Sequence, residues 1–170
     1  NRKNTIVDTL VSGIESLIKK NNIQYLKGNA SFDSTELVRV SSEKNDYLVY
    51  AKDIIIATGS KVSTPKIPGV DLECVMNSTD ALSNESNFNS ITIVGGGVIG
   101  MEFACLYRNL GIEVNVVEFT NHLLNMLDTE ISDEFERIIK DKGVNVYTSS
   151  AVSKIQMKND KKAVITYKNN

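Results

Sequence analysis

The sequence predicts an α/β fold with a parallel sheet, and two observations carry this prediction. First, apolar runs at residues 91–94, 113–118 and 144–147 alternate with segments of helical spacing at 98–110 and 130–142. Second, glycines follow the first run and end each helical segment. Because consecutive β-α-β units place their strands side by side, this order predicts a parallel sheet with right-handed helical crossovers.

The first part of the chain predicts one helix and several short strands. From residue 5 to 20, apolar residues recur at intervals of three and four, which is the spacing of one helical stripe. Residues 23–26 predict a short strand, and 36–40 and 47–51 alternate as the two arms of a hairpin. The continuous apolar run 54–57 predicts a strand buried on both faces.

A change of composition separates these two parts. Both prolines, Pro65 and Pro68, lie between them, and an Asn- and Ser-rich stretch follows. We therefore predict a first unit over residues 1–70, a linker over 71–89 and a second unit over 90–170.

The C-terminal end of the chain predicts an antiparallel hairpin beside the parallel sheet. Residues 152–157 and 163–167 read as its two strands. The charged stretch 159–162 between them reads as its turn.

The composition is that of an ordinary globular protein. The 170 residues are 41% apolar and 24% charged, with a formal net charge of −2. No basic field favours nucleic acid as a partner, and no apolar run reaches the roughly 20 residues that span a bilayer. Two distant cysteines, Cys74 and Cys105, and a single histidine, His122, predict neither a disulfide framework nor a metal site. Isolated thiols favour a cytoplasmic location.

The pattern Gly95-x-Gly97-x-x-Gly100 carries the most chemical information. A buried-type strand precedes it, a helix follows without a gap, and the next strand ends in Glu118 at nearly the expected distance of about 20 residues. These are the conditions of a Rossmann dinucleotide site. Gly95 permits the turn, Gly97 permits close approach of a pyrophosphate, and Gly100 permits packing of the helix on the sheet.

The same segment favours NAD over NADP. Glu118 can accept hydrogen bonds from both hydroxyls of the adenosine ribose and would repel a 2′-phosphate. Residues 119–123 contain no Arg or Lys to receive one. Two alternatives stay open: a glycine loop that only makes a turn, and a methyltransferase-type domain that binds another nucleoside cofactor.

Two further positions have both a structural and a functional interpretation, and a third has a structural one. Glu102, which we place in the first turn of the helix, either interacts with the helix dipole or contacts the nicotinamide end of the cofactor. Thr58-Gly59-Ser60 is either a strand terminus or a main-chain contact to a ligand. His122 is interpreted as a solvated loop residue.

Five short segments occur in a fixed order along the chain. They are AKDIIIATGS at 51–60, IPG at 67–69, STDAL at 78–82, IVGGGVIGMEFA at 93–104 and VVE at 116–118. In this order they resemble the pyridine-nucleotide-disulfide oxidoreductase family. Together with the helical segment 2–20 and residues 126–131, they are most similar to its dihydrolipoamide dehydrogenase subgroup.

The resemblance implies that the first unit is part of an FAD-binding domain and that the second is an NAD-binding Rossmann domain without its last strand. It implies NAD contacts at Gly95, Gly96, Gly97, Val98, Ile99, Gly100, Met101, Glu102, Glu118 and Val152. It implies FAD contacts at Ala30, Thr58, Gly59 and Ser60.

The resemblance also implies an oxidoreductase that passes electrons from dihydrolipoyl thiols through a cysteine disulfide and FAD to NAD. It implies a homodimer and a place in a 2-oxoacid dehydrogenase or glycine-cleavage complex. The paired redox cysteines and the His–Glu pair of the family are absent from these residues. We therefore expect no catalytic residue here and no turnover by these residues alone.

Alternatives to this function remain at the level of sequence. One is another flavin disulfide reductase or an NADH oxidase, acting on glutathione, coenzyme A disulfide, mercuric ion or oxygen. The other is a non-catalytic module that senses NAD.

Overall fold

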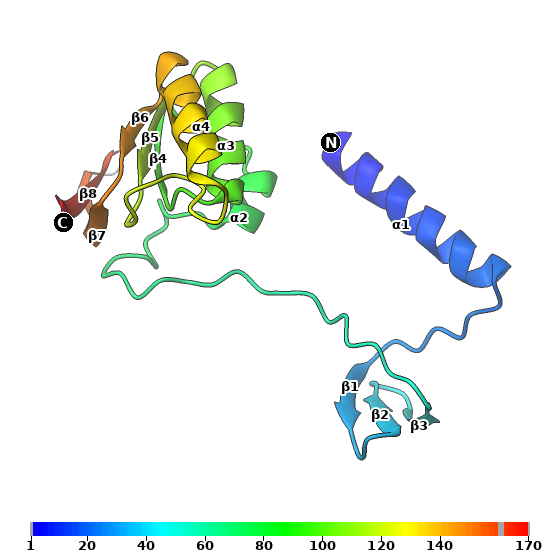
Figure 1. The fold of residues 1–170 in the computed structure, drawn as a ribbon. Coiled ribbons are helices and arrows are strands. Elements are labelled where there is room, and N and C mark those ends of the chain that lie inside the picture. Colours follow the sequence, from blue (N-terminus) through cyan, green and yellow to red (C-terminus); the bar gives the residue numbers. More distant parts are fainter. Residues whose placement is uncertain (1, 160–161, 170) are drawn as a thin grey trace. The chain divides into compact units, whose positions relative to one another are not determined.

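The computed structural model describes residues 2–159 and 162–169, and the chain forms two compact units, Asn1–Gly59 and Ser60–Asn170 (Figure 1). The proline segment that follows Gly59 belongs to the second unit, where the carbonyl oxygen of Pro68 accepts a hydrogen bond from the N–H of Ile155 at 2.8 Å.

The first unit contains a long helix and a small antiparallel sheet. Helix α1 spans Arg2–Lys20, and the sheet has the order β1-β2-β3. Its strands are Asn29–Phe32, Leu37–Ser41 and Asp46–Tyr50. The predicted helix and the predicted hairpin β2-β3 are thus confirmed.

Two predicted strands of the first unit were wrong. Residues 23–26 form no strand, and β1 begins instead at Asn29, after Gly28. Gly28 comes so close to β2 that a Cβ atom on it would meet the carbonyl oxygen of Ser41 at 2.6 Å. The first residue of β1 to pair with β2 is Asn29, which lies opposite Ser41.

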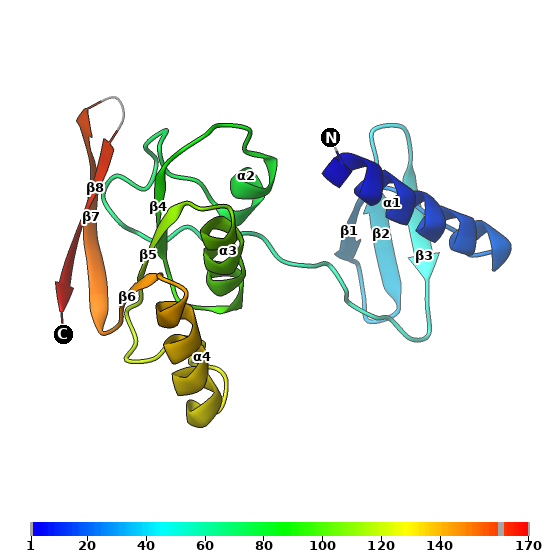
Figure 2. The same cartoon turned by 90° about the horizontal axis from the view of Figure 1, so that it is seen from above.

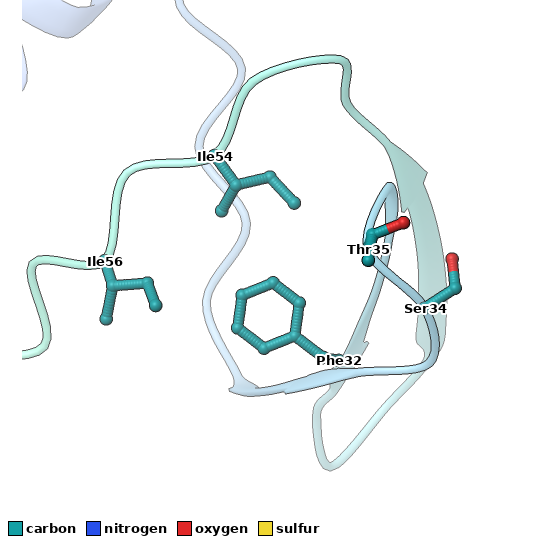
Figure 3. Close-up of a pocket in the computed structure, with 5 residues that line it drawn as sticks. All are labelled: Phe32, Ser34, Thr35, Ile54 and Ile56. Carbon is teal, nitrogen blue, oxygen red and sulfur yellow. The ribbon is translucent and has the colours of Figure 1, made fainter.

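The run 54–57 is also not a strand. Ile55 is 92% exposed and Ile56 is 70% exposed, whereas a strand buried on both faces needs neighbouring strands and covering layers. The sheet β1-β2-β3 supplies neither to these residues. Instead Ile54 and Ile56 line an open hollow of about 450 Å³, in which the ring of Phe32 points toward Ile54 (Figure 3).

The second unit contains the predicted parallel sheet, in the order β4-β5-β6. Its strands are Ser90–Val94, Glu113–Val117 and Asn145–Tyr147. Helix α3 (Val98–Asn109) connects the first two strands, and α4 (Thr129–Asp141) lies between the second and third in sequence. Both helices cover one face of the sheet (Figures 1 and 2). The predicted α/β class is confirmed.

The core of the second unit lies between this sheet and its helices. Val114 and Val116 of β5 are completely buried. They belong to the same buried cluster as Ala104 of α3 and Ile139 of α4. The side chains of Val114 and Val116, two positions apart on β5, therefore point to the same face of the sheet and into the core, as the pleat of a strand requires. Because β4 and β5 pair in parallel, with Val94 opposite Val117, their carboxyl ends lie next to each other.

Helix α2 (Ser78–Ser83) was not predicted. The side chain of Asn77 accepts hydrogen bonds from the N–H groups of Thr79 and Asp80 at 2.8 and 3.0 Å. The carboxylate of Asp80 accepts one from the N–H of Asn77 at 3.2 Å. This capping box starts the helix inside a segment whose Asn and Ser content indicates a linker.

The C-terminal hairpin is confirmed. Strands β7 (Ser150–Asn159) and β8 (Lys162–Asn169) pair antiparallel on the side of the sheet away from the helices (Figures 1 and 2). Residues 160 and 161 of the expected turn lie outside the described residues. The segment Pro68–Gly69 packs against β7 so closely that a Cβ atom on Gly69 would overlap the carbonyl oxygen of Ile155.

Replacement of Gly69 by Ala should therefore destabilise the second unit more than a matched replacement elsewhere in it. Gly69 and Gly111 both have positive φ, +89° and +83°, but a Cβ atom on Gly111 would meet nothing within 4 Å. We expect Gly111→Ala to cost about 1 kcal/mol of unfolding free energy from strain alone. Gly69→Ala should cost about 1–3 kcal/mol more, because the overlap adds to the strain. Urea unfolding measures both, and equal losses would contradict the close contact.

Candidate functional site

The three glycines of the predicted dinucleotide pattern have different surroundings. Gly95 adopts a φ of +111°, and its N–H donates to the carbonyl oxygen of Val117 at 2.9 Å, so the chain turns directly at the sheet edge. Gly100 faces the start of the loop: a Cβ atom on it would overlap the carbonyl oxygen of Gly95 and lie 3.3 Å from Ile93. At these two positions the fold itself requires glycine.

Gly97 is different, because no protein atom lies within 4 Å of the place where its Cβ atom would be. It is exposed, has an extended backbone, and precedes α3 without any side-chain hydrogen bond capping the helix. The first N–H groups of a helix lack intrahelical partners and carry partial positive charge. The open space at Gly97 therefore lies where an anion could approach the main chain. Val98 and Ile99, which follow, are 44% and 59% exposed.

Gly96, which lies between Gly95 and Gly97 in the sequence, is buried beneath the loop that follows β5. A Cβ atom on Gly96 would come within 3.1 Å of Glu118 and still closer to Leu123, a completely buried residue. The carbonyl oxygen of Gly96 accepts a hydrogen bond from Leu124 at 2.8 Å. The loop after β5 is thus fastened to the glycine loop.

The carboxylate of Glu118 is held by donors on both oxygens. Oε2 accepts a hydrogen bond from the N–H of Gly96, and Oε1 accepts two from Thr120, from the N–H at 2.6 Å and from the hydroxyl at 2.7 Å. The main chain of Glu118 is also paired, with the carbonyl oxygen of Tyr147 and the N–H of Ser150, each at 2.8 Å. The acid therefore lies beside the glycine loop, as the sequence pattern predicted.

These contacts determine the charge state of Glu118. Burial alone would raise its pKa, but hydrogen bonds from the main chain of Thr120 and Gly96, from the Thr120 hydroxyl and from the main chain of Phe119 stabilise the carboxylate. The net pKa is below the ordinary value. Glu118 is therefore ionised at neutral pH, and it remains an acceptor of hydrogen bonds.

Three other predicted NAD contacts, Met101, Glu102 and Val152, lie outside the glycine loop. Met101 is 2% exposed and belongs to the core, and its N–H donates to the carbonyl oxygen of Gly97 at 3.0 Å. The placement of Glu102 in the first turn of the helix was wrong: α3 begins at Val98, and its first turn contains no acid. With about 3.6 residues per turn, the exposed Glu102 falls in the second turn, which weakens its interaction with the helix dipole. Val152 lies in β7, two positions after the strand begins at Ser150.

The predicted FAD contacts come from separate parts of the chain. Ala30 is an exposed residue of β1 that pairs with Val40, whereas Thr58 and Gly59 are exposed at the end of the first unit. Gly59 has a φ of +72°, a conformation that favours glycine. Ser60 begins the second unit.

The structure adds residues that sequence reasoning missed. Thr120 bonds Glu118, and Leu123 and Leu124 hold the loop over Gly96. Two adjacent leucines in an otherwise polar loop could have indicated this buried anchor. His122 is partly exposed, with its Nδ1 atom 3.2 Å from Asp133. Cys74 and Cys105 are free thiols.

Two kinds of site are missing from the ranges 2–159 and 162–169. No group of three or more His, Cys, Asp or Glu residues could hold a metal ion there. No helix within these ranges has both the length and the apolar character needed to cross a membrane.

The lowered pKa of Glu118 predicts a pH-dependent contribution to stability. This contribution is complete above the pKa of a glutamate in the unfolded chain, about 4.3, and is lost as pH falls through the lower pKa of the folded state. The loss of unfolding free energy in Glu118→Gln should therefore shrink as the pH is lowered from about 7 to 3. Glu113→Gln, at the exposed start of the same strand, is the control variant. A pH-independent loss in Glu118→Gln would contradict the assignment.

Solved structures share this fold. The Cu(II) complex of the HOCl-induced flavoprotein disulfide reductase RclA from Escherichia coli matches with a TM-score of 0.82 and 28% identity, over 99% of this chain and 38% of that one. The structure of a NAD-dependent persulfide reductase from A. fulgidus matches with a TM-score of 0.72 and 28% identity, over 90% of this chain and 30% of that one.

Sequence comparison gives more similar relatives. Dihydrolipoyl dehydrogenase of Bacillus subtilis is 38% identical over 91% of this chain and 34% of its own length. Dihydrolipoamide dehydrogenase of Chaetomium thermophilum is 40% identical over 88% of this chain and 30% of its own length. The chain thus spans about a third of these curated relatives. The family profile described as pyridine nucleotide-disulphide oxidoreductase matches residues 2–170. The chain belongs to the pyridine nucleotide-disulphide oxidoreductase family.

Proposed function

We propose that the second unit binds NAD(H) between the glycine loop and Glu118. The observation that carries the proposal is the open space at Gly97. Gly95 is a glycine because of its backbone conformation, and Gly96 and Gly100 because protein atoms leave no room for a side chain. Gly97 has neither reason, so a ligand that approaches the main chain explains it best.

The residues of this site fit the two polar parts of the cofactor. The uncapped start of α3 offers N–H groups and a positive helix dipole to the pyrophosphate. The ionised Glu118 accepts hydrogen bonds from the hydroxyls of the adenosine ribose. Exposed Val98 and Ile99, together with Glu102 and Val152, are the remaining proposed contacts, and buried Met101 supports the loop from beneath. When bound, NAD supplies the hydride acceptor, while this chain binds and orients it.

The family to which the chain belongs uses FAD and NAD(P). We propose that the whole protein is a dihydrolipoamide dehydrogenase, in which dihydrolipoyl thiols reduce NAD through a disulfide and FAD. Relatives of that name at 38% and 40% identity support this substrate. Ala30, Thr58, Gly59 and Ser60 are proposed FAD contacts. A cytoplasmic homodimer within a 2-oxoacid dehydrogenase or glycine-cleavage complex completes the proposal.

A second candidate is another flavin disulfide reductase. The similarity to the E. coli disulfide reductase and to the persulfide reductase of A. fulgidus, each at 28% identity, supports it. The two candidates share the NAD site and differ in the groups that meet the sulfur substrate. Assays of the whole protein with dihydrolipoamide and with persulfide or disulfide substrates distinguish them.

The NAD site is tested by calorimetric titration of the chain with NADH, comparing wild type with Gly97→Val. The valine side chain would fill the space proposed for the pyrophosphate, so we expect NADH affinity to fall by at least about tenfold. Because a Cβ atom at Gly97 meets no protein atom within 4 Å, the urea midpoint should change little. Gly111→Ala, which is remote from the loop in sequence, serves as the control for a glycine replacement. Unchanged NADH affinity in Gly97→Val would refute the site.

Cofactor preference tests the role of Glu118. Its negative charge should repel the 2′-phosphate of NADPH, so the wild-type chain should bind NADH more tightly. Glu118→Gln removes the charge and should reduce the ratio of NADH to NADPH affinity by about fivefold or more, mainly through weaker NADH binding. Glu113→Gln should keep the wild-type ratio. If the two variants behave alike, Glu118 does not contact the ribose.

A further inference from the structure

Thr120 lies in a hydrogen-bond arrangement that allows its hydroxyl to change partners. Its N–H donates to Oε1 of Glu118 at 2.6 Å, and its carbonyl oxygen accepts from Ser149 at 2.7 Å, so its main chain is fixed on both sides. Its hydroxyl oxygen lies 2.7 Å from the same Oε1 atom and 2.9 Å from the carbonyl oxygen of His122. A hydroxyl has one hydrogen, and both neighbours are acceptors.

The two acceptors give the hydroxyl two alternative partners within hydrogen-bond distance. Without a ligand, the bond to the carboxylate is favoured, since hydrogen bonds to ionised groups are the stronger ones. When another hydroxyl donates to Oε1, that of Thr120 can rotate to His122 and remain satisfied. No side chain or main-chain segment has to move.

We propose that Thr120 is a positioning residue that keeps Glu118 oriented and charged for the ribose hydroxyls, and yields its place on Oε1 when they bind. This inference rests on the proposed NAD(H) site and extends it to a residue outside the glycine pattern. It makes the polarity of the residue two positions after the acid a determinant of NADH binding.

The electrostatic surroundings allow this role to be measured. The contributions that lower the pKa of Glu118 are hydrogen bonds from Thr120, Gly96 and Phe119, and no charged side chain contributes among the described residues. Among the titratable groups of the neighbouring loop and of α4, His122 and Asp133 contact each other, with Nδ1 of His122 at 3.2 Å from Oδ1 of Asp133. Loss of the Thr120 hydroxyl therefore removes one of the bonds that keep Glu118 ionised.

The test is calorimetric titration with NADH of the wild-type chain, Thr120→Val and Thr120→Ser between about pH 4 and 8. Thr120→Val keeps the shape of the side chain and the N–H but loses the hydroxyl, whereas Thr120→Ser keeps the hydroxyl. Protonation of Glu118 removes its charge and makes it a weaker acceptor, so NADH affinity should fall as the pH decreases. In Thr120→Val this fall should begin at higher pH and leave NADH affinity about fivefold weaker than wild type near pH 5. Thr120→Ser should follow the wild-type profile.

The outcomes separate this inference from the proposed site. If the folded wild-type chain binds no NADH, the proposed site itself fails, and the inference with it. If the wild type binds NADH and Thr120→Val has the same pH profile, only the role of Thr120 is refuted. An equal loss at every pH in Thr120→Val would indicate a packing role and would also overturn the inference. Urea unfolding of the same samples verifies that each variant is folded.

Discussion

The arrangement of the second unit depends on the contact between Glu118 and Gly96. This contact joins the residue after β5 to the loop after β4, which are the two places where the parallel strands end. A carboxylate that leaves water needs donors to replace it, and here main-chain N–H groups and one hydroxyl supply them. The same bonds orient the acid, lower its pKa and draw the following loop over the glycines.

The glycine loop shows how one residue type meets different requirements at neighbouring positions. Backbone conformation requires glycine at Gly95, whereas contacts with Leu123, Glu118 and the Gly95 carbonyl require it at Gly96 and Gly100. Three of the four loop glycines are thus needed for folding whether or not a nucleotide binds. Only Gly97 stands apart, and it is the position at which structure and function can be separated by mutation.

The first unit illustrates the opposite situation, in which local structure forms without burial of its apolar residues. Helix α1 has no buried residue. Even on its apolar stripe, Leu10, Ile14 and Leu17 are each at least 59% exposed. Most helices gain their stability from packing such a stripe against other elements. In the same unit Ile55 and Ile56 are also exposed. The apolar pattern here predicts the helix α1, but it does not predict how far the side chains of that helix are buried.

Residue patterns alone were sufficient to predict the helices α1, α3 and α4, the parallel strands and both hairpins. They also predicted the position of Glu118 relative to the glycine loop. Periodicity and glycine placement are local properties, and for these elements the signal lies within their own residues. Residues 23–26 and 54–57 were assigned wrongly because a strand exists only where a partner offers its main chain, which an apolar run cannot reveal. The tertiary structure also decided that Met101 enters the core, that Glu102 lies beyond the first turn, and that Thr120 holds the acid. Each of these depends on which atoms meet in space, and spacing along the chain does not specify that.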